Sequence, residues 1–306
     1  METFVSLSRT IGRLLTAMVT PFDDEGQVDY RQAQRLALAL LDTGSDGLVV
    51  AGTTGEAPTL TREEKLRLFA EVKRAVDGRG SVIAGTGSYS TEESVELSRQ
   101  AERAGVDGLL LTVPYYNRPS QEGLFRHFEA IAKATSLPCI LYNIPSRTGM
   151  NMTAETTLRL SRIPNIVGVK EASGNLEQIA RIVAHGREGF RLWSGDDAMT
   201  LPILSVGGYG VICVVSHLAG TQMREMIEAY LSGRGEEASR IHRRLLPLMS
   251  TLMTAASNPM PIKYALNQVG FRVGQPRLPL LEPDEATGER IMAEVRRQRI
   301  DLAVAV

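Results

Sequence analysis

The chain has 306 residues, of which 43% are hydrophobic and 23% charged, and its formal net charge is −1. These values are typical of a globular protein with a sizeable core. A near-neutral charge argues against a nucleic-acid partner, which would need a basic face, and no apolar run is long enough for a membrane span. Because the first residues lack the pattern of a secretion signal, we expect a cytoplasmic protein with Cys139 and Cys213 as buried free thiols.

Short apolar runs alternate with helical patterns from residue 13 to about residue 232. Eight such runs are almost continuously apolar, as in parallel strands that are covered on both faces. Amphipathic segments at 30–41, 62–76, 92–104 and 121–134 lie between them. The eight predicted strands are 14–19, 47–51, 81–84, 108–113, 138–142, 166–169, 191–194 and 210–215.

Eight strand–helix repeats in about 220 residues predict an α/β protein built as a (β/α)8 barrel, also called a TIM barrel. A doubly wound open sheet is the alternative, but no GxGxxG fingerprint follows the first strand. Three helical patterns then follow without a strand between them, at 236–253, 261–269 and 285–298. We therefore expect a catalytic barrel over residues 1–233 and a C-terminal three-helix extension over residues 234–306.

Lysine is scarce in this chain, because only five of its 34 basic residues are lysines. Four of the five, Lys65, Lys73, Lys133 and Lys263, lie in helical patterns and are expected to be solvated. Lys170 alone follows directly on an apolar strand. In TIM barrels the chemistry lies at the carboxyl ends of the strands, so Lys170 is the first candidate catalytic residue.

An amine at such a strand end would lose its water, and this loss lowers the pKa of a lysine. The neutral amine can attack a ketone and form a Schiff base. The alternative for Lys170 is a structural lysine that pairs with Glu171 or Asp196. Tyr142, at the end of a neighbouring strand, could carry the protons that this chemistry moves, or could simply fill the barrel.

Two further strand ends carry groups that suit a small carboxylate substrate. Thr53 and Thr54 lie in a glycine-flanked turn, where hydroxyls and backbone N–H groups can surround an anion. Arg147 lies on a loop, and its guanidinium can hold a carboxylate by two hydrogen bonds. An ordinary turn and a surface ion pair are the structural alternatives.

Other kinds of site have weaker support in the sequence. Glycines at 207–210 leave room for a phosphate group. The four histidines lack the spacing of a metal site.

Five ordered motifs together resemble a known family: GTTGEAPTL, VPYYNRPSQEGL, LYNIPSRTG, VGVKEASGN and SGDD. They are similar to motifs of the 4-hydroxy-tetrahydrodipicolinate synthases, or dihydrodipicolinate synthases, in the superfamily of N-acetylneuraminate lyase and the class I pyruvate aldolases. The resemblance covers essentially the whole barrel. It implies a lyase of lysine and diaminopimelate biosynthesis that needs no cofactor and no metal and assembles as a homotetramer, a dimer of dimers.

The resemblance also implies catalytic roles for individual residues. Lys170 would form the Schiff base with pyruvate, and Tyr142 would donate and accept protons. Thr53 would complete a proton relay with Tyr116, which would reach in from a neighbouring subunit.

Substrate-binding residues follow from the same resemblance. Thr54 and the backbone of Ile212 would hold pyruvate, and Arg147 would receive L-aspartate 4-semialdehyde. Two alternatives stay open. One is another pyruvate-dependent class I aldolase or lyase that acts on a different aldehyde or a 2-keto sugar acid, and the other is a non-catalytic barrel that serves as a sensor or scaffold.

Lysine-inhibited members of this family bind lysine at the dimer interface through, among others, a histidine, an asparagine and a glutamate. The matching positions here are Lys65, Tyr89 and Glu93, and Tyr115 is implied to be an interface tyrosine. Only the glutamate is retained. Because a lysine in place of the histidine would repel a cationic effector, we expect weak or absent inhibition by L-lysine.

Overall fold

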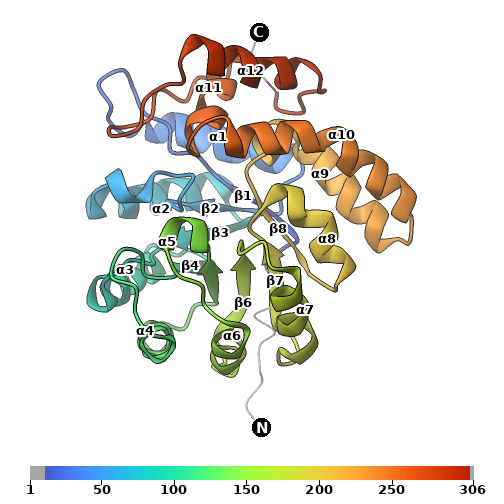
Figure 1. Cartoon of the computed structure of the whole chain (residues 1–306). Coiled ribbons are helices and arrows are strands. Elements are labelled where there is room, and N and C mark those ends of the chain that lie inside the picture. The colour runs from blue at the N-terminus through green and yellow to red at the C-terminus, as the bar shows by residue number, and fades with distance from the viewer. Residues whose placement is uncertain (1–10, 304–306) are drawn as a thin grey trace.

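The computed structural model describes residues 11–303 of the chain, and its eight parallel strands form the closed barrel of Figure 1. Pairing of Leu15 in the first strand with Ile212 in the last closes the sheet. This closure excludes the open doubly wound sheet and confirms the predicted TIM barrel. Residues 1–10 and 304–306 of the predicted domains lie outside the described residues. The strands are β1 (Leu14–Ala17), β2 (Gly47–Val50), β3 (Ser81–Gly85), β4 (Gly108–Thr112), β5 (Cys139–Asn143), β6 (Ile166–Glu171), β7 (Arg191–Ser194) and β8 (Gly210–Cys213).

Helices follow the strands and surround the barrel (Figure 1). The second helix, α2 (Arg62–Val76), has the limits that the sequence predicts, because Thr61 and Glu64 cap its amino end reciprocally. The other helices for which the sequence predicts limits begin and end within two residues of them. The remaining barrel helices are α1 (Tyr30–Asp42), α3 (Thr91–Arg103), α4 (Gln121–Lys133), α5 (Pro145–Thr148), α6 (Ala154–Leu160), α7 (Leu176–His185), α8 (Thr200–Ser205) and α9 (Ser216–Leu231).

Two separate apolar cores stabilise the barrel. The outer core lies between the sheet and its helices and includes Leu36 and Phe69. The inner core fills the barrel and includes Trp193, Tyr142 and Ile212. Successive residues of a strand point to opposite faces, so each strand contributes to both cores. This alternation decides which polar residues near the strand ends face the inside of the barrel.

The extension after the barrel consists of three helices, α10 (Gly235–Thr254), α11 (Met260–Gln268) and α12 (Glu285–Arg296), as the sequence predicts. α10 packs against α9 and α12, and α11 packs against α9, α10 and α12. Figure 1 shows the three helices together at one side of the barrel. The extension is therefore anchored to the last barrel helix instead of forming a separate body.

The glycine-rich segment 207–210, which leaves room for a phosphate group, does not lie at the carboxyl ends of the strands. It leads into β8, which begins at Gly210, so it lies at the opposite end of the barrel. Tyr209 within this run packs its ring against the guanidinium groups of Arg13 and Arg191 and against Trp193. The side chain of Tyr209 thus packs at the amino-terminal end of the barrel and covers it.

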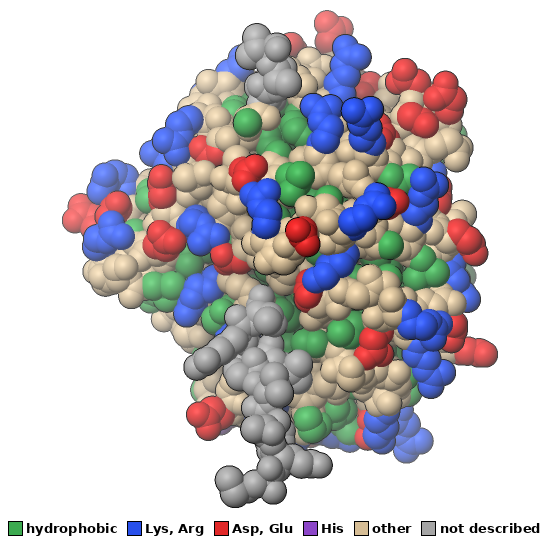
Figure 2. Space-filling model, turned by 180° about the vertical axis from the view of Figure 1, so that it is seen from behind, with side chains coloured by type: hydrophobic (Ala, Val, Ile, Leu, Met, Phe, Trp, Pro, Cys, Tyr) green, Lys and Arg blue, Asp and Glu red, His purple; other side chains and the backbone are tan. Residues whose placement is uncertain are grey.

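The surface carries mixed charge. On the face seen in Figure 2, basic and acidic side chains are interspersed, and neither sign gathers into one large patch. Within residues 11–303, none of the helices combines the length and the apolar character that crossing a membrane requires.

Candidate active site

Neighbouring strands bring Lys170 and Tyr142 together inside the barrel. Lys170 lies in β6, and in the parallel register it is the direct partner of Tyr142 in β5. The Lys170 Nζ atom lies 4.2 Å from the centroid of the Tyr142 ring. Both side chains are buried, and Lys170 is only 5% exposed. The sequence places both residues at strand ends, and the strand register makes them neighbours.

The surroundings of Lys170 make its amine easier to deprotonate than an ordinary lysine. Burial lowers the pKa of Lys170 from 10.5 to about 8, and the nearby carboxylate of Asp197 opposes this change. A lysine with a pKa of about 8 presents about a tenth of its molecules as free amine at pH 7. The amine is the nucleophilic form, so Lys170 can attack a carbonyl group in this site.

The structural alternative for Lys170, an ion pair with Glu171 or Asp196, is absent from the described part of the chain. Glu171 accepts hydrogen bonds from neutral donors, among them the Asn143 amide at 3.1 Å. Asp196 accepts a hydrogen bond from the Ala198 backbone N–H at 2.9 Å and begins a short 3-10 turn. Both carboxylates therefore have other partners.

Asp197 is part of the surroundings of Lys170. It is buried, and it accepts hydrogen bonds from the backbone N–H groups of Val214 and Val215, directly after β8. Burial raises the pKa of Asp197, and those two N–H groups oppose the rise. The carboxylate thus ties β7 to the end of β8 and lies near Lys170.

Tyr142 is suited to hold and return a proton. Burial raises the pKa of its hydroxyl, and the Arg147 charge together with a hydrogen bond with Thr53 opposes the rise. The hydroxyl therefore stays protonated near neutral pH and can act as a donor. Thr53 is half-buried in the turn after β2, close enough to Tyr142 for its hydroxyl to oppose this rise in pKa.

Asn258, which sequence reasoning did not single out as a site residue, connects two predicted substrate-binding residues. Its side-chain amide donates a hydrogen bond to the Thr54 Oγ1 atom at 2.9 Å, and its backbone carbonyl accepts one from Arg147 at 3.2 Å. Arg147 is exposed on α5 and has no ion pair within the described residues. Ile212 is buried in β8 with its side chain in the inner core.

Tyr116 does not reach the Lys170 site within a single chain. It follows β4, is 93% exposed, and adopts a left-handed backbone conformation with φ of 74°. Its neighbour Tyr115 packs edge-on against Tyr89, with ring centroids 5.3 Å apart. The loop after β4 thus presents one tyrosine to the surface and holds the other against the protein.

The three positions that match the effector site and the predicted interface tyrosine Tyr115 lie near one another. Burial raises the pKa of the Tyr115 hydroxyl, and the nearby Glu93 carboxylate adds to this rise. Burial lowers the pKa of Lys65, and the nearby Glu93 carboxylate opposes this change. Glu93 accepts a hydrogen bond from the Ser88 hydroxyl at 2.8 Å.

The expectation that four lysines are solvated is wrong in part. Lys133 is exposed, whereas Lys65 and Lys73 are half-buried, and Lys73 pairs with Asp107 at 2.5 Å. Lys263 is completely buried, because the packing of α11 turns it toward the barrel loops. Two of the five lysines, Lys170 and Lys263, are therefore buried amines.

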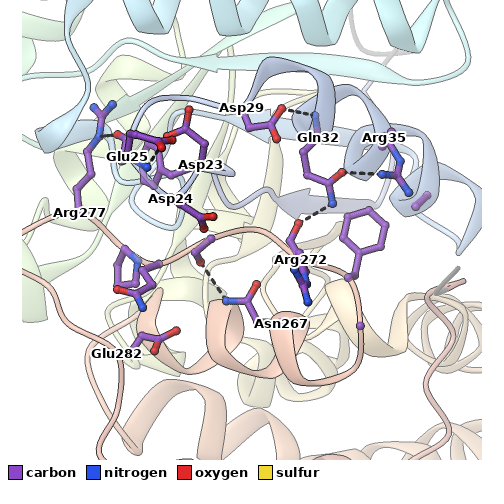
Figure 3. A pocket seen from close by; sticks show the side chains of 18 of the residues that line it. Asp23, Asp24, Glu25, Asp29, Gln32, Arg35, Asn267, Arg272, Arg277 and Glu282 are labelled. Atoms are coloured by element: carbon purple, nitrogen blue, oxygen red, sulfur yellow. Dashed lines mark hydrogen bonds between the residues drawn. The ribbon is translucent and has the colours of Figure 1, made fainter. Parts of the chain in front are cut away.

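A large open groove lies elsewhere, between the segment after β1 and the extension, as Figure 3 shows. None of the predicted site residues lines it. Its polar groups bind one another across the groove: the Gln32 amide donates to the Arg272 carbonyl, and Arg277 donates to the Gly26 carbonyl at 2.8 Å. Within residues 11–303 no group of three His, Cys, Asp or Glu side chains is placed to hold a metal ion.

Comparison with known proteins places these features in a family context. The model of the dihydrodipicolinate synthetase family matches residues 10–298. The chain is 59% identical over 296 residues to the 4-hydroxy-tetrahydrodipicolinate synthase of Dehalococcoides mccartyi strain CBDB1, which covers 97% of this chain and 99% of that protein. It is 58% identical over 285 residues to the enzyme of the same name from Moorella thermoacetica, which covers 93% of this chain and 97% of that one.

Among solved structures, the fold is similar to that of the dihydrodipicolinate synthase from Cyanidioschyzon merolae with lysine bound. The TM-score is 0.92 and the sequence identity is 49%, and the match covers 94% of this chain and 98% of that chain.

Proposed function

Because the chain belongs to the dihydrodipicolinate synthetase family, we propose that it condenses pyruvate with L-aspartate 4-semialdehyde and cyclises the adduct to 4-hydroxy-tetrahydrodipicolinate. This is a lyase reaction of lysine and diaminopimelate biosynthesis. The observation that supports it most directly is the buried amine of Lys170, 4.2 Å from the Tyr142 ring centroid. Such an amine is required by Schiff-base chemistry and by few structural roles.

In the first step the neutral amine of Lys170 attacks the keto carbon of pyruvate, while Thr54 and the backbone of Ile212 hold the pyruvate. The carbonyl oxygen leaves as water after it receives protons, and Tyr142 supplies and recovers protons through its hydroxyl. The resulting iminium draws electrons from the adjacent methyl group, which loses a proton and becomes an enamine carbon nucleophile.

In the second step the enamine carbon attacks the aldehyde carbon of L-aspartate 4-semialdehyde and forms the new carbon–carbon bond, while the aldehyde oxygen takes up a proton and becomes the hydroxyl group of the product. The exposed guanidinium of Arg147 holds the substrate's carboxylate at the mouth of the barrel. The substrate amine then attacks the imine carbon, which closes the ring and releases Lys170. Tyr142 returns a proton to the leaving amine, so the enzyme regains its starting form.

A second copy of the chain completes the proton relay in this proposal. Thr53 contacts Tyr142 within the chain, whereas Tyr116 is 93% exposed and available to a neighbouring subunit. We therefore assign the working form to a homotetramer, a dimer of dimers, in the cytoplasm, where the buried Cys139 and Cys213 stay reduced.

Regulation by L-lysine is weak or absent in this proposal. Lys65 lies within reach of the Glu93 charge, so a cationic effector that approaches Glu93 would meet a second cation there.

The proposal is tested by borohydride reduction in the presence of pyruvate, followed by peptide mapping. A pyruvate adduct on Lys170 is expected, and its absence would overturn both the synthase and the other pyruvate-dependent aldolases. A coupled assay with L-aspartate 4-semialdehyde then identifies the aldehyde. An adduct without turnover of this semialdehyde would point to an aldolase for another aldehyde or a 2-keto sugar acid.

A further inference from the structure

A completely buried ion pair joins the extension to the loop after β2. Lys263 in α11 is 0% exposed, and its ammonium lies 2.8 Å from the Glu56 carboxylate. The two residues are 207 positions apart in the chain. Burial lowers the pKa of Lys263 to about 8, and the Glu56 carboxylate opposes this change.

The pair is embedded in a nearly complete set of polar partners. The Lys263 ammonium also donates to the Gln275 carbonyl at 3.1 Å and lies 4.1 Å from the centre of the Phe22 ring. The second Glu56 oxygen accepts a hydrogen bond from the Arg277 backbone N–H at 2.9 Å. Arg277 and Phe22 also line the groove of Figure 3, so the pair lies beneath its wall.

A buried ion pair of this kind contributes little to stability compared with apolar residues of the same size, because both charges lose their water. The ion pair instead fixes the position of the loop relative to the extension, since both charged groups must stay in place to remain paired. The backbone of Glu56 needs such a fixed partner, because it adopts a left-handed conformation with φ of 56°. That conformation is unfavourable for a residue with a side chain and needs support from its surroundings.

The position of Glu56 connects the pair to the active site. Glu56 follows the Thr53–Thr54–Gly55 turn directly, and its backbone N–H donates to the Thr53 carbonyl at 3.1 Å. A second contact from the extension, the hydrogen bond from the Asn258 amide to Thr54, holds the same turn. The turn that carries both threonines is thus tied to the extension at two points.

We propose that Lys263 is a positioning residue for the pyruvate site, because through Glu56 it holds the turn that presents Thr53 and Thr54 to the substrate. This inference rests on the proposed function, which assigns the turn to pyruvate and to the proton relay. Lys263 itself touches neither substrate nor Lys170. Its partner Glu56 acts through the backbone of the turn.

The test separates positioning from stability with two variants and a matched control. Lys263→Met leaves the Glu56 carboxylate buried without a partner, so it weakens folding as well as the turn. Lys263→Met with Glu56→Gln removes both charges and restores a neutral interior. The control is Lys73→Met, which breaks the half-buried pair with Asp107 on the outer side of the barrel.

The measurements are the melting temperature, the KM for pyruvate and the trapping of pyruvate on Lys170. The double variant is expected to melt near the wild-type temperature while its pyruvate KM stays about 10-fold raised, because a misplacement of about 1 Å near a reacting group is costly. Lys73→Met is expected to keep the wild-type KM. A double variant with both wild-type melting temperature and wild-type pyruvate KM would overturn the inference.

Two further outcomes are decisive. If neither Lys263 variant folds, the same KM measurement is made on Glu56→Gln alone, and a wild-type value overturns the inference. If the wild-type protein itself traps no pyruvate on Lys170, the proposed function fails. If the wild-type protein forms the pyruvate adduct on Lys170 and the variants keep the wild-type KM for pyruvate, only the positioning role of Lys263 is refuted.

Discussion

Replacement of Lys170 by Met is expected to abolish catalysis and to stabilise the fold at neutral pH. The Lys170 ammonium is buried and has no ion pair within the described residues, so the native state holds its charge at a cost. Burial lowers the pKa from 10.5 to about 8. Since one pKa unit corresponds to about 1.4 kcal/mol, the native state loses about 3 kcal/mol by keeping this lysine charged.

The gain from Lys170→Met depends on pH in a defined direction. Below about pH 8 the lysine is protonated in both the folded and the unfolded state, so the full penalty applies to the wild type. Between about pH 8 and 10.5 the unfolded state binds more protons than the folded state, and the wild type gains stability as the pH rises. Above 10.5 both states are neutral, and the penalty disappears.

The assay is urea unfolding of both proteins at pH 7 and at pH 10, at equal protein concentration because assembly also contributes to stability. We expect the variant to be about 2–3 kcal/mol more stable at pH 7, since loss of the contact with the Tyr142 ring returns about 0.5–1 kcal/mol. The difference should shrink at pH 10. The exposed Lys133→Met serves as control, with a change within about 0.5 kcal/mol at both pH values. A Lys170→Met protein without extra stability at pH 7, or with a gain that does not change with pH, would refute this account of the buried amine.

Other predictions test the remaining roles. Tyr142→Phe should lower kcat by about 10²–10⁴-fold while borohydride still traps pyruvate on Lys170, and loss of the adduct would contradict a role limited to proton transfer. Arg147→Met should lower kcat/KM for the semialdehyde by about 10–100-fold, because a hydrogen bond to a charged group is worth about 1.5–3 kcal/mol, with pyruvate adduct formation unchanged. L-Lysine should not inhibit at micromolar concentration in a coupled assay, and a micromolar inhibition constant would contradict the proposed effect of Lys65. Specific activity should fall on dilution as subunits separate, and Tyr116→Ala should show a similar loss at high protein concentration.

Much of the fold can be read from the chain because its signals are local. Apolar runs of four to six residues in alternation with amphipathic helices occur within short windows, so the eight strands and the three extension helices follow from periodicity. Helix ends are less certain from sequence: the third helix begins at Thr91, because Ser90 accepts the capping hydrogen bond from the Glu93 N–H.

The sequence also predicts the amine at a strand end, since Lys170 is the one lysine within an apolar strand pattern. The family motifs add its neighbours Tyr142, Thr53 and Arg147. Their contact, however, depends on strand register: the pairing of Tyr142 with Lys170 exists because β5 and β6 align at that step.

Only the tertiary structure decides the surroundings of the second buried lysine. Lys263 and Glu56 are 207 positions apart, and Asn258 and Thr54 are 204 apart, so no local pattern predicts that they meet. The packing of α11 against α9, α10 and α12 orients Lys263 toward the loop after β2. An amphipathic helix has the same local sequence signal whether a lysine on it reaches water or a buried carboxylate. The difference arises from what packs against the helix, and this is a property of the whole fold.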